Sequence, residues 1–404
     1  MDLTIAAAPA CSRSRHDAAP RRRRAVLAIT TSFLPQSRGD AARNRALISM
    51  LRSAGWMVTV VLLTGAGTEV IGAPEMRTEC DEFLVWRASR EIFPAGSSEV
   101  DAWCPDGYAR YVSDICAATG AAALVVQHVM LSKCLAFTRA RSPKTLLVVD
   151  THDVFSDRLQ VFSSAGVVYE GFTTDRGEER AALSRADIVI AQQEADFATF
   201  VEYDLPSRVV LLPHPSRAVR LPRAAHRAAL FVGDDNDVNV KGVQAFLSYV
   251  LPQVRRRFAD FRLYLAGRVT DAFGSCEPVV CLGFMEDLAQ AYARALVVVN
   301  LEACGTGLKI KTAEALLHGR ALVTTPAGAQ GLEPYGDSFR TGRDWAEFAR
   351  LLQELLADPA SAHLLGDRAL QFASWYFDPQ MLGERLNSCI ANVAGTHGSA
   401  QVTC

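Results

Sequence analysis

Residues 305–319 read GTGLKIKTAEALLHG, and this stretch is the strongest indication of the fold in the sequence. It follows the apolar run ALVVVN at residues 295–300 and precedes a second β-prone run, RALVTT, at residues 320–325. This order predicts a strand, a glycine turn, a helix and another strand, which is the repeating unit of a parallel sheet. Gly305 and Gly307 let backbone N–H groups approach an anion closely, and the helix start adds partial positive charge. We therefore expect this turn to bind an anionic ligand.

The charged side chains of the same stretch indicate what the anion is. Lys309 and Lys311 stand at the expected helix start, where the helix dipole favours acids, so a bound phosphate would account for them. Glu314 is expected two turns into the helix, on the same side, where its carboxylate can accept hydrogen bonds from sugar hydroxyls. The pattern favours a nucleotide-sugar site. The alternative is an ordinary strand–turn–helix unit in which the glycines only permit the turn.

This stretch resembles the donor-binding motif of glycosyltransferase family 4, the retaining glycosyl transferases group 1, and the resemblance extends from about Val26 to Ile390. It implies the α/β GT-B fold, in which two Rossmann-like parallel-sheet domains face each other across a cleft. The family usually carries two glutamates separated by seven residues. Glu314 matches the second, whereas Thr306 stands in place of the first. The Gly-x-Gly-x-Lys-x-Lys form of residues 305–311 is similar to one branch of the family.

The chain of 404 residues is too long for one ordinary domain and alternates between strand and helix patterns, which indicates two α/β domains. With the resemblance, the expected organisation is as follows: a disordered basic segment over 1–24, a Rossmann-like acceptor domain over 25–213, a linker over 214–227, a Rossmann-like nucleotide-sugar donor domain over 228–376, a helix over 377–393 that crosses back to the first domain, and a loose tail over 394–404.

The resemblance also implies which residues of the second domain bind the donor: Gly233, Lys241, Gly283, Phe284, Gly305, Thr306, Gly307, Leu308 and Lys311. Two of these positions have ordinary alternatives, because Lys241 could be a solvated lysine and Phe284 a core aromatic. Residues 235–237 read DND and fit an Asp-x-Asp metal pattern, but we interpret them as turn and helix-cap residues. We expect no metal and no cofactor, with the nucleotide sugar as substrate.

The acceptor side depends on the residues that follow the strands of the first domain. Residues 150–154 read DTHDV after a buried strand, at the edge where open parallel sheets bind ligands. A neutral imidazole both donates and accepts, so His152 suits sugar hydroxyls, although a histidine satisfied at a strand end is the alternative. Asp150 and Asp153 are expected to orient it, and His128 is a further acceptor-side candidate. Arg38 and Gly39 form the expected acceptor or phosphate loop.

Composition excludes several other classes of protein. The formal net charge of −2 offers no basic footprint for a nucleic acid. Ten scattered cysteines without a C-x-x-C pair favour reduced thiols in a cytosolic protein. No apolar run reaches the length of a membrane helix, and the basic run follows rather than precedes the apolar stretch of the N-terminus, which argues against a secretion signal. Arg21–Arg24 is either a solvated tail or a contact with anionic lipid at the inner face of the membrane.

The combined prediction is a cytoplasmic enzyme that transfers a sugar from a nucleotide-sugar donor to a hydroxyl of a glycan or lipid-linked acceptor. The catalytic set is His152, Lys309 and Glu314. Two alternatives remain open: a GT-B protein that binds without catalysis, which the threonine at position 306 would favour, and a sugar-nucleotide epimerase.

Overall fold

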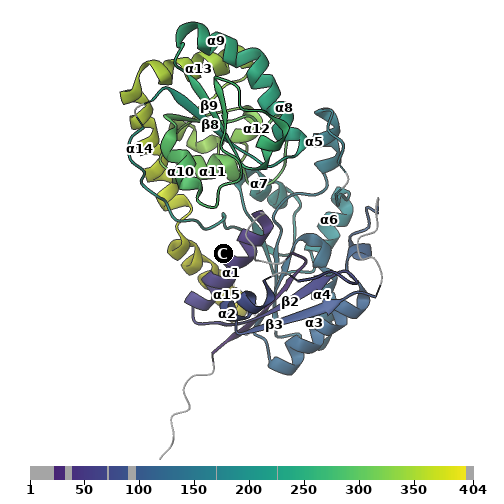
Figure 1. Ribbon diagram of the computed structural model, residues 1–404. Helices are drawn as coiled ribbons and strands as arrows, with labels where there is room; N and C mark the ends of the chain where they lie inside the picture. Colours follow the sequence, from purple (N-terminus) through teal and green to yellow (C-terminus); the bar gives the residue numbers. More distant parts are fainter. Residues whose placement is uncertain are drawn as a thin grey trace, which may run out of the picture.

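The computed structural model of the chain describes residues 22–31, 39–70, 72–89, 97–169, 171–224 and 226–396. It has two α/β domains, each with a twisted parallel sheet between two layers of helices (Figure 1). The predicted fold class is therefore confirmed.

The first domain contains a seven-stranded sheet in the order β3-β2-β1-β4-β5-β6-β7, and every pairing is parallel. Its strands are β1 (Arg24–Ile29), β2 (Met57–Thr64), β3 (Glu82–Arg87), β4 (Ala123–Gln127), β5 (Leu146–Asp150), β6 (Ile188–Ala191) and β7 (Arg208–Leu211). Its helices are α1 (Gly39–Ser53), α2 (Ala73–Glu79), α3 (Asp106–Thr119), α4 (Lys133–Arg141), α5 (Arg158–Ser164), α6 (Arg176–Leu183) and α7 (Glu194–Glu202).

The second domain contains a six-stranded parallel sheet in the order β10-β9-β8-β11-β12-β13. Its strands are β8 (Ala228–Val232), β9 (Arg262–Ala266), β10 (Val279–Cys281), β11 (Val297–Asn300), β12 (Ala321–Thr324) and β13 (Arg340–Thr341). Its helices are α8 (Asp237–Ala245), α9 (Leu251–Arg257), α10 (Leu288–Arg294), α11 (Ile310–Leu317), α12 (Pro326–Ala329), α13 (Trp345–Ala357) and α14 (Pro359–Tyr376).

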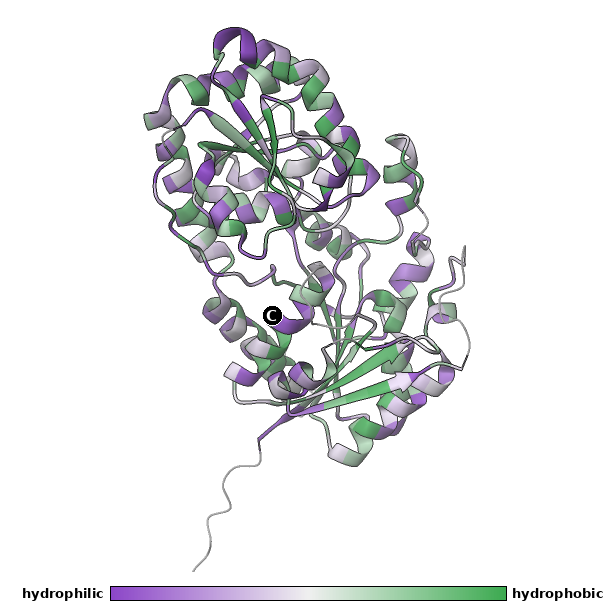
Figure 2. Cartoon of the chain, in the orientation of Figure 1, coloured by the Kyte–Doolittle hydropathy of each residue, from purple (hydrophilic) through white to green (hydrophobic). Residues whose placement is uncertain are grey.

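Both sheets are buried on their two faces, because successive residues of a strand point to opposite sides. In β1, Val26 and Ala28 join one core cluster, while Ala25, Leu27 and Ile29 join the cluster on the other face. The strands accordingly form continuous hydrophobic runs inside each domain, whereas the hydrophilic residues lie on the outer helices (Figure 2). Within the described residues, no helix combines the length and the apolar character that a membrane crossing requires.

The last helix, α15 (Pro379–Thr396), leaves the second domain and packs against α1 and the core of the first (Figure 1). Leu382, Leu386, Cys389 and Ile390 are buried in that core. The helix continues to Thr396, so residues 394–396 are helical rather than part of the loose tail expected from 394 onward.

Two arginines of the basic N-terminal run, Arg23 and Arg24, contact other residues of the first domain. Arg24 belongs to the strand rather than to a disordered segment, and it contacts the hydroxyl of Thr59 and the carboxylate of Glu82. The Arg23 guanidinium lies 6.0 Å from the ring of Trp56. Residues 1–21, including Arg21, lie outside the described residues.

A buried ion pair joins α1, β5 and the start of the linker. The Arg43 guanidinium donates to both oxygens of Asp150 at 2.9 Å and to the carbonyl of Pro213 at 2.8 Å. Both side chains are essentially inaccessible. Burial alone would raise the pKa of Asp150, but the charge of Arg43 holds it below its ordinary value.

Replacement of Arg43 by leucine should strongly destabilise the first domain, because it leaves a buried carboxylate without its counter-charge. We expect a loss of about 3–5 kcal/mol in the free energy of unfolding, measured by urea denaturation followed through tryptophan fluorescence. Arg45→Leu is the matched control. Arg45 lies on the exposed side of α1 and pairs with Glu79 of α2, so its replacement should cost below about 1 kcal/mol. Equal effects of the two variants would contradict the assignment.

Candidate functional site

The candidate site lies where the carboxyl ends of the two sheets face each other. In each sheet the strand order reverses there, between β1 and β4 in one and between β8 and β11 in the other, which is where open α/β sheets bind ligands. A cavity of about 560 Å³ opens between the domains. Its lining includes Thr30, Gly39, Asp40, His128, His152, Asp153, Arg158, His214, Thr306, Gly307 and Leu308.

The turn after β11 contains two glycines with positive φ angles, a conformation that other residues rarely adopt. Gly305 has φ 147° and Gly307 has φ 71°. A side chain at Gly307 would place its Cβ 3.2 Å from the Asp153 carboxylate and from the His152 carbonyl oxygen, so the glycine permits the two domains to touch. Helix α11 begins only at Ile310, with Lys309 as its N-cap. Glu314 therefore lies one turn from the helix start rather than the two turns expected.

Lys309 is a buried cation without a direct partner. Its side chain is 3% exposed, and its ammonium makes no hydrogen bond or ion pair with any described residue. Burial lowers its pKa, although the nearby carboxylates of Glu302, Asp153 and Asp196 oppose this shift. An unpaired buried charge is costly, so an anionic ligand beside Gly305, whose Cβ position is 3.3 Å from this ammonium, would satisfy it.

Lys311 differs from the expectation that it contributes free positive charge. Its ammonium pairs at 2.6 Å with Glu302, which follows β11 and was not identified from the sequence. Burial would raise the pKa of Glu302, but Lys311 and Lys309 lower it. The charge of Lys311 is thus largely neutralised inside the protein, whereas Lys309 has carboxylates nearby but forms no direct ion pair with any described residue.

Glu314 is partly buried and does not line the interdomain cavity. Its Oε2 accepts a hydrogen bond from the Tyr292 hydroxyl at 3.1 Å, and burial raises the pKa of the carboxyl. The Tyr292 ring stacks on His318 at 4.2 Å.

Two histidines form the floor of the cavity on the side of the first domain. His128 and His152 follow β4 and β5, and both have positive φ angles, 64° and 63°. Such strain in a non-glycine residue costs of order 1–3 kcal/mol and concentrates at functional sites. Their rings lie 4.1 Å apart. His152 Nε2 contacts Gln127 Oε1 and lies 3.6 Å from Asp150, while Nδ1 of His128 is buried without a partner among the described residues.

Asp153 does not orient His152, contrary to expectation. Its Oδ2 accepts hydrogen bonds from the Thr306 hydroxyl at 2.8 Å and from Arg158 Nε at 3.0 Å. Arg158 also donates to Thr306 at 3.1 Å and to the Tyr169 hydroxyl at 2.6 Å. Asp153 turns away because the donor turn of the second domain lies directly against it, so this network joins the two domains.

The other predicted donor residues lie around the same sheet edge but outside the cavity. Lys241 is half-exposed on α8 and contacts the Gly166 carbonyl of the first domain at 3.3 Å and Asp237 at 3.7 Å. The carbonyl oxygen of Gly233 accepts a hydrogen bond from the N–H of residue 269, and that of Gly283 accepts one from the N–H of residue 267. Phe284 is 71% exposed, which rules out a core role.

Between β1 and α1 the structure describes residues 30 and 31. Arg38 lies outside the described residues. Gly39 begins α1 and lies against Ile310, since a Cβ there would be 2.5 Å from Ile310 Cδ1. Asn236 caps α8 by accepting from the N–H of Asn239 at 3.0 Å, as interpreted from residues 235–237. Among the residues that the structure describes, no three His, Cys, Asp or Glu side chains are placed to hold a metal ion.

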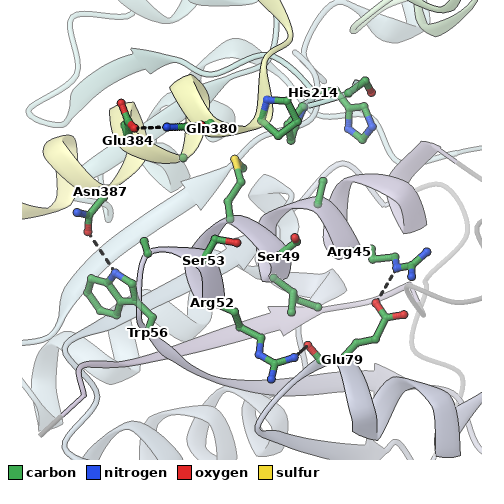
Figure 3. A pocket seen from close by; sticks show the side chains of 18 of the residues that line it. Arg45, Ser49, Arg52, Ser53, Trp56, Glu79, His214, Gln380, Glu384 and Asn387 are labelled. Carbon is green, nitrogen blue, oxygen red and sulfur yellow. Dashed lines mark hydrogen bonds and ion pairs between the residues drawn. The ribbon is translucent and has the colours of Figure 1, made fainter. Parts of the chain in front are cut away.

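A larger cavity of about 1520 Å³ lies on the far side of α1, between α1, α15 and the linker. Figure 3 shows Ser49 and Ser53 of α1 opposite Gln380 and Glu384 of α15, with Arg45 and Arg52 turned toward Glu79. These arginines are already paired, and no residue of the glycine turn reaches this cavity. The chemistry therefore points to the smaller, interdomain cavity; His214 lines both.

Comparison with known proteins identifies a matching domain and a shared fold. Residues 226–358 match the family model "Glycosyl transferases group 1". No curated protein sequence matches the chain significantly. The fold resembles the sucrose-phosphate synthase of Thermosynechococcus elongatus (TM-score 0.66, 17% identity, 93% of this chain and 100% of that one).

Two further solved structures show the same fold. One is HepE of Anabaena in complex with UDP (TM-score 0.66, 13% identity, 92% and 100% of the two chains). The other is a glycosyltransferase from Rickettsia africae (TM-score 0.66, 8% identity, 92% and 99%).

The buried histidines predict that the protein loses stability in mild acid. Burial lowers the pKa of His128 and of His214 to about 4, against an ordinary value of 6.5. Between these values the unfolded chain binds more protons than the folded one, so stability is full above about pH 6.5 and is lost as pH falls toward 4. For His214 alone this amounts to at most about 3 kcal/mol.

Thermal denaturation from pH 7.5 to 4.5 measures this loss. His214→Gln should flatten the pH dependence of the melting temperature, whatever its effect at neutral pH. His226→Gln, at an exposed position, should follow the unchanged protein. Parallel curves for all three proteins would contradict the prediction.

Proposed function

We propose that the chain is a glycosyltransferase that transfers a sugar from a nucleotide-sugar donor to a hydroxyl acceptor. Residues 226–358 match the glycosyl transferases group 1 model, and the two parallel-sheet domains have the GT-B arrangement. The observation that carries this proposal is Lys309, a buried ammonium without a direct partner among the described residues, next to a glycine turn at a helix N-terminus. A nucleoside diphosphate offers the charge that this arrangement lacks.

The proposal assigns donor-side roles to residues of the second domain. Lys309 and the amides of residues 305–307 would hold the diphosphate, and the charge that develops as it departs would be stabilised there. Glu314, held by Tyr292, would accept hydrogen bonds from the ribose. Gly283 and the exposed Phe284 would border the base. That HepE binds UDP and UDP-glucose makes a uridine nucleotide the first candidate.

The acceptor would enter from the side of the first domain. His152 and His128 line the cavity there, and the unpartnered Nδ1 of His128 can accept a hydrogen bond from a sugar hydroxyl. We propose transfer with retention of configuration. The bond between the anomeric carbon and the phosphate oxygen breaks, the acceptor oxygen bonds to the same face, and the acceptor's proton passes to the departing phosphate.

The proposed class of acceptor rests on the family resemblance. A glycan or lipid-linked acceptor of cell-surface polysaccharide synthesis fits the family resemblance, with the enzyme in the cytoplasm. Contact with anionic lipid through the N-terminal arginines would rest mainly on Arg21 and Arg22, because Arg23 lies by Trp56 and Arg24 pairs with Glu82.

Removal of the Lys309 charge should weaken nucleotide binding. A ligand at 100 times its dissociation constant stabilises a protein by about 2.7 kcal/mol. Lys309→Ala should raise the dissociation constant about 10- to 100-fold, because a charge-assisted contact is lost, and should reduce this stabilisation to roughly 0.4–1.4 kcal/mol. A thermal-shift screen with UDP, GDP, ADP, CMP and dTDP measures it. Lys144→Ala, at an exposed lysine far from the turn, is the control; an undiminished shift in Lys309→Ala would refute the assignment.

Acceptor-dependent release of nucleotide separates transfer from the two rival functions. With the nucleotide sugar selected by the screen, free nucleoside diphosphate should accumulate faster when a mixture of glycan acceptors is added, and Glu314→Ala should reduce the rate. An epimerase would instead change the sugar without any acceptor, which NMR of the nucleotide sugar would reveal. Binding without turnover under every condition would support the non-catalytic alternative.

A further inference from the structure

Asp153 carries a carboxylate of which only one oxygen is used. The residue is 3% exposed, and its Oδ2 accepts hydrogen bonds from Thr306 and Arg158. Oδ1 is buried and has no hydrogen-bond partner among the described residues. A buried acceptor without a donor costs about 1–3 kcal/mol, so the arrangement calls for a ligand that brings an O–H or N–H group.

The place of Asp153 in the cavity wall indicates the chemistry of the ligand. Asp153 lines the interdomain cavity beside His152 and Gly307, and a Cβ on Gly307 would lie 3.2 Å from the carboxylate. The diphosphate of the proposed donor would occupy the amides and the ammonium on the other side of this same turn. Since the sugar is joined directly to that diphosphate, its ring would lie at the mouth of the turn, within reach of Asp153.

The donor turn itself offers no carboxylate for this ring. Residues 305–310 read GTGLKI, and the first acidic residue of the helix, Glu314, contacts Tyr292 and does not line the cavity. Thr306 instead holds the carboxylate of the other domain, by donating its hydroxyl proton to Asp153 Oδ2. Arg158 fixes the same oxygen from the opposite side and is itself held by Tyr169. This leaves Oδ1 as the free, oriented acceptor.

We propose that Asp153 is a sugar-binding and specificity-determining residue, whose Oδ1 accepts a hydrogen bond from a hydroxyl of the transferred sugar. The inference rests on the proposed function and deepens it. The nucleotide would be recognised by the second domain alone, whereas the sugar would be recognised by a carboxylate that the first domain brings to the Gly305–Gly307 turn. Discrimination between sugars would then require the closed arrangement of the two domains.

The affinities for a nucleoside diphosphate and for its nucleotide sugar test whether the two domains recognise different parts of the donor. Dissociation constants would be measured by isothermal titration for UDP and UDP-glucose, for GDP and GDP-mannose, and for ADP and ADP-glucose. The variants are then measured with the pair of ligands that binds the unchanged protein most tightly. Asp153→Asn should leave the affinity for the nucleoside diphosphate within about twofold, yet lower the affinity for the nucleotide sugar about 10- to 100-fold, the range for one hydrogen bond to a charged group.

Thr306→Val is the matched variant for the contact between the domains. It removes the hydrogen bond to Oδ2 but leaves the carboxylate and Arg158 in place, so it should weaken nucleotide-sugar binding less than Asp153→Asn does. If Asp153 served only to hold the domains together, the two variants would have equal effects and would act on nucleotide and nucleotide sugar alike, which would overturn the proposal.

Deoxy derivatives of the selected nucleotide sugar supply a readout that does not depend on a variant folding. One of the derivatives lacking a single sugar hydroxyl should bind the unchanged protein about 10- to 100-fold more weakly, and that penalty should vanish in Asp153→Asn. Equal binding of all derivatives would overturn the inference while leaving nucleotide binding, and so the proposed function, intact.

Two further outcomes are separable. A raised KM for the acceptor with unchanged nucleotide-sugar affinity would assign Oδ1 to an acceptor hydroxyl and overturn the assignment to the transferred sugar. No binding of any nucleotide would overturn the proposed function and, with it, this inference.

Discussion

The ion pair between Arg43 and Asp150 is the interaction on which the site depends. It is inaccessible to solvent and ties the first turns of α1 to the end of β5, and its third hydrogen bond reaches the carbonyl that begins the linker. Residues 151–153, which carry His152 and Asp153 into the cavity, continue directly from that anchored strand end. A pair buried this deeply is weak as a source of stability but strong as a determinant of position, since only one geometry satisfies both charges.

The second domain contains a buried cation, Lys309, that has no direct partner among the described residues. Lys311 is neutralised by Glu302, and Lys309 is held under the glycine turn without a direct partner among the described residues. Each domain therefore contains a complete internal ion pair, and the second domain also contains a buried ammonium that has no direct partner among the described residues. A ligand that carries both negative charge and hydroxyl groups would meet the remaining demands of the cleft, at Lys309 and at Oδ1 of Asp153.

The sequence predicts the architecture well because its signals are local. The alternation of apolar runs and glycine turns is enough for two parallel sheets, and the residues after strand ends, such as His152 and Gly305–Gly307, fall at the cleft by topology alone. The pairings across the domains could not be predicted in this way. Glu302 and Arg158 lie in stretches without a recognisable motif, and the contact of Asp153 with Thr306 joins residues 153 positions apart. Whether a lysine such as Lys311 is free or paired likewise depends on tertiary contacts.

The return of α15 to the first domain has a consequence for how the protein is made. Four of its apolar residues complete the core beside α1 and β2, but they are translated after the whole second domain. At typical synthesis rates the ribosome needs on the order of ten seconds or more to travel from the linker to these residues. During that interval the first domain has an open hydrophobic face, so its final assembly must wait until α15 has been synthesised. The second domain, whose own core requires nothing from α15, can form beforehand.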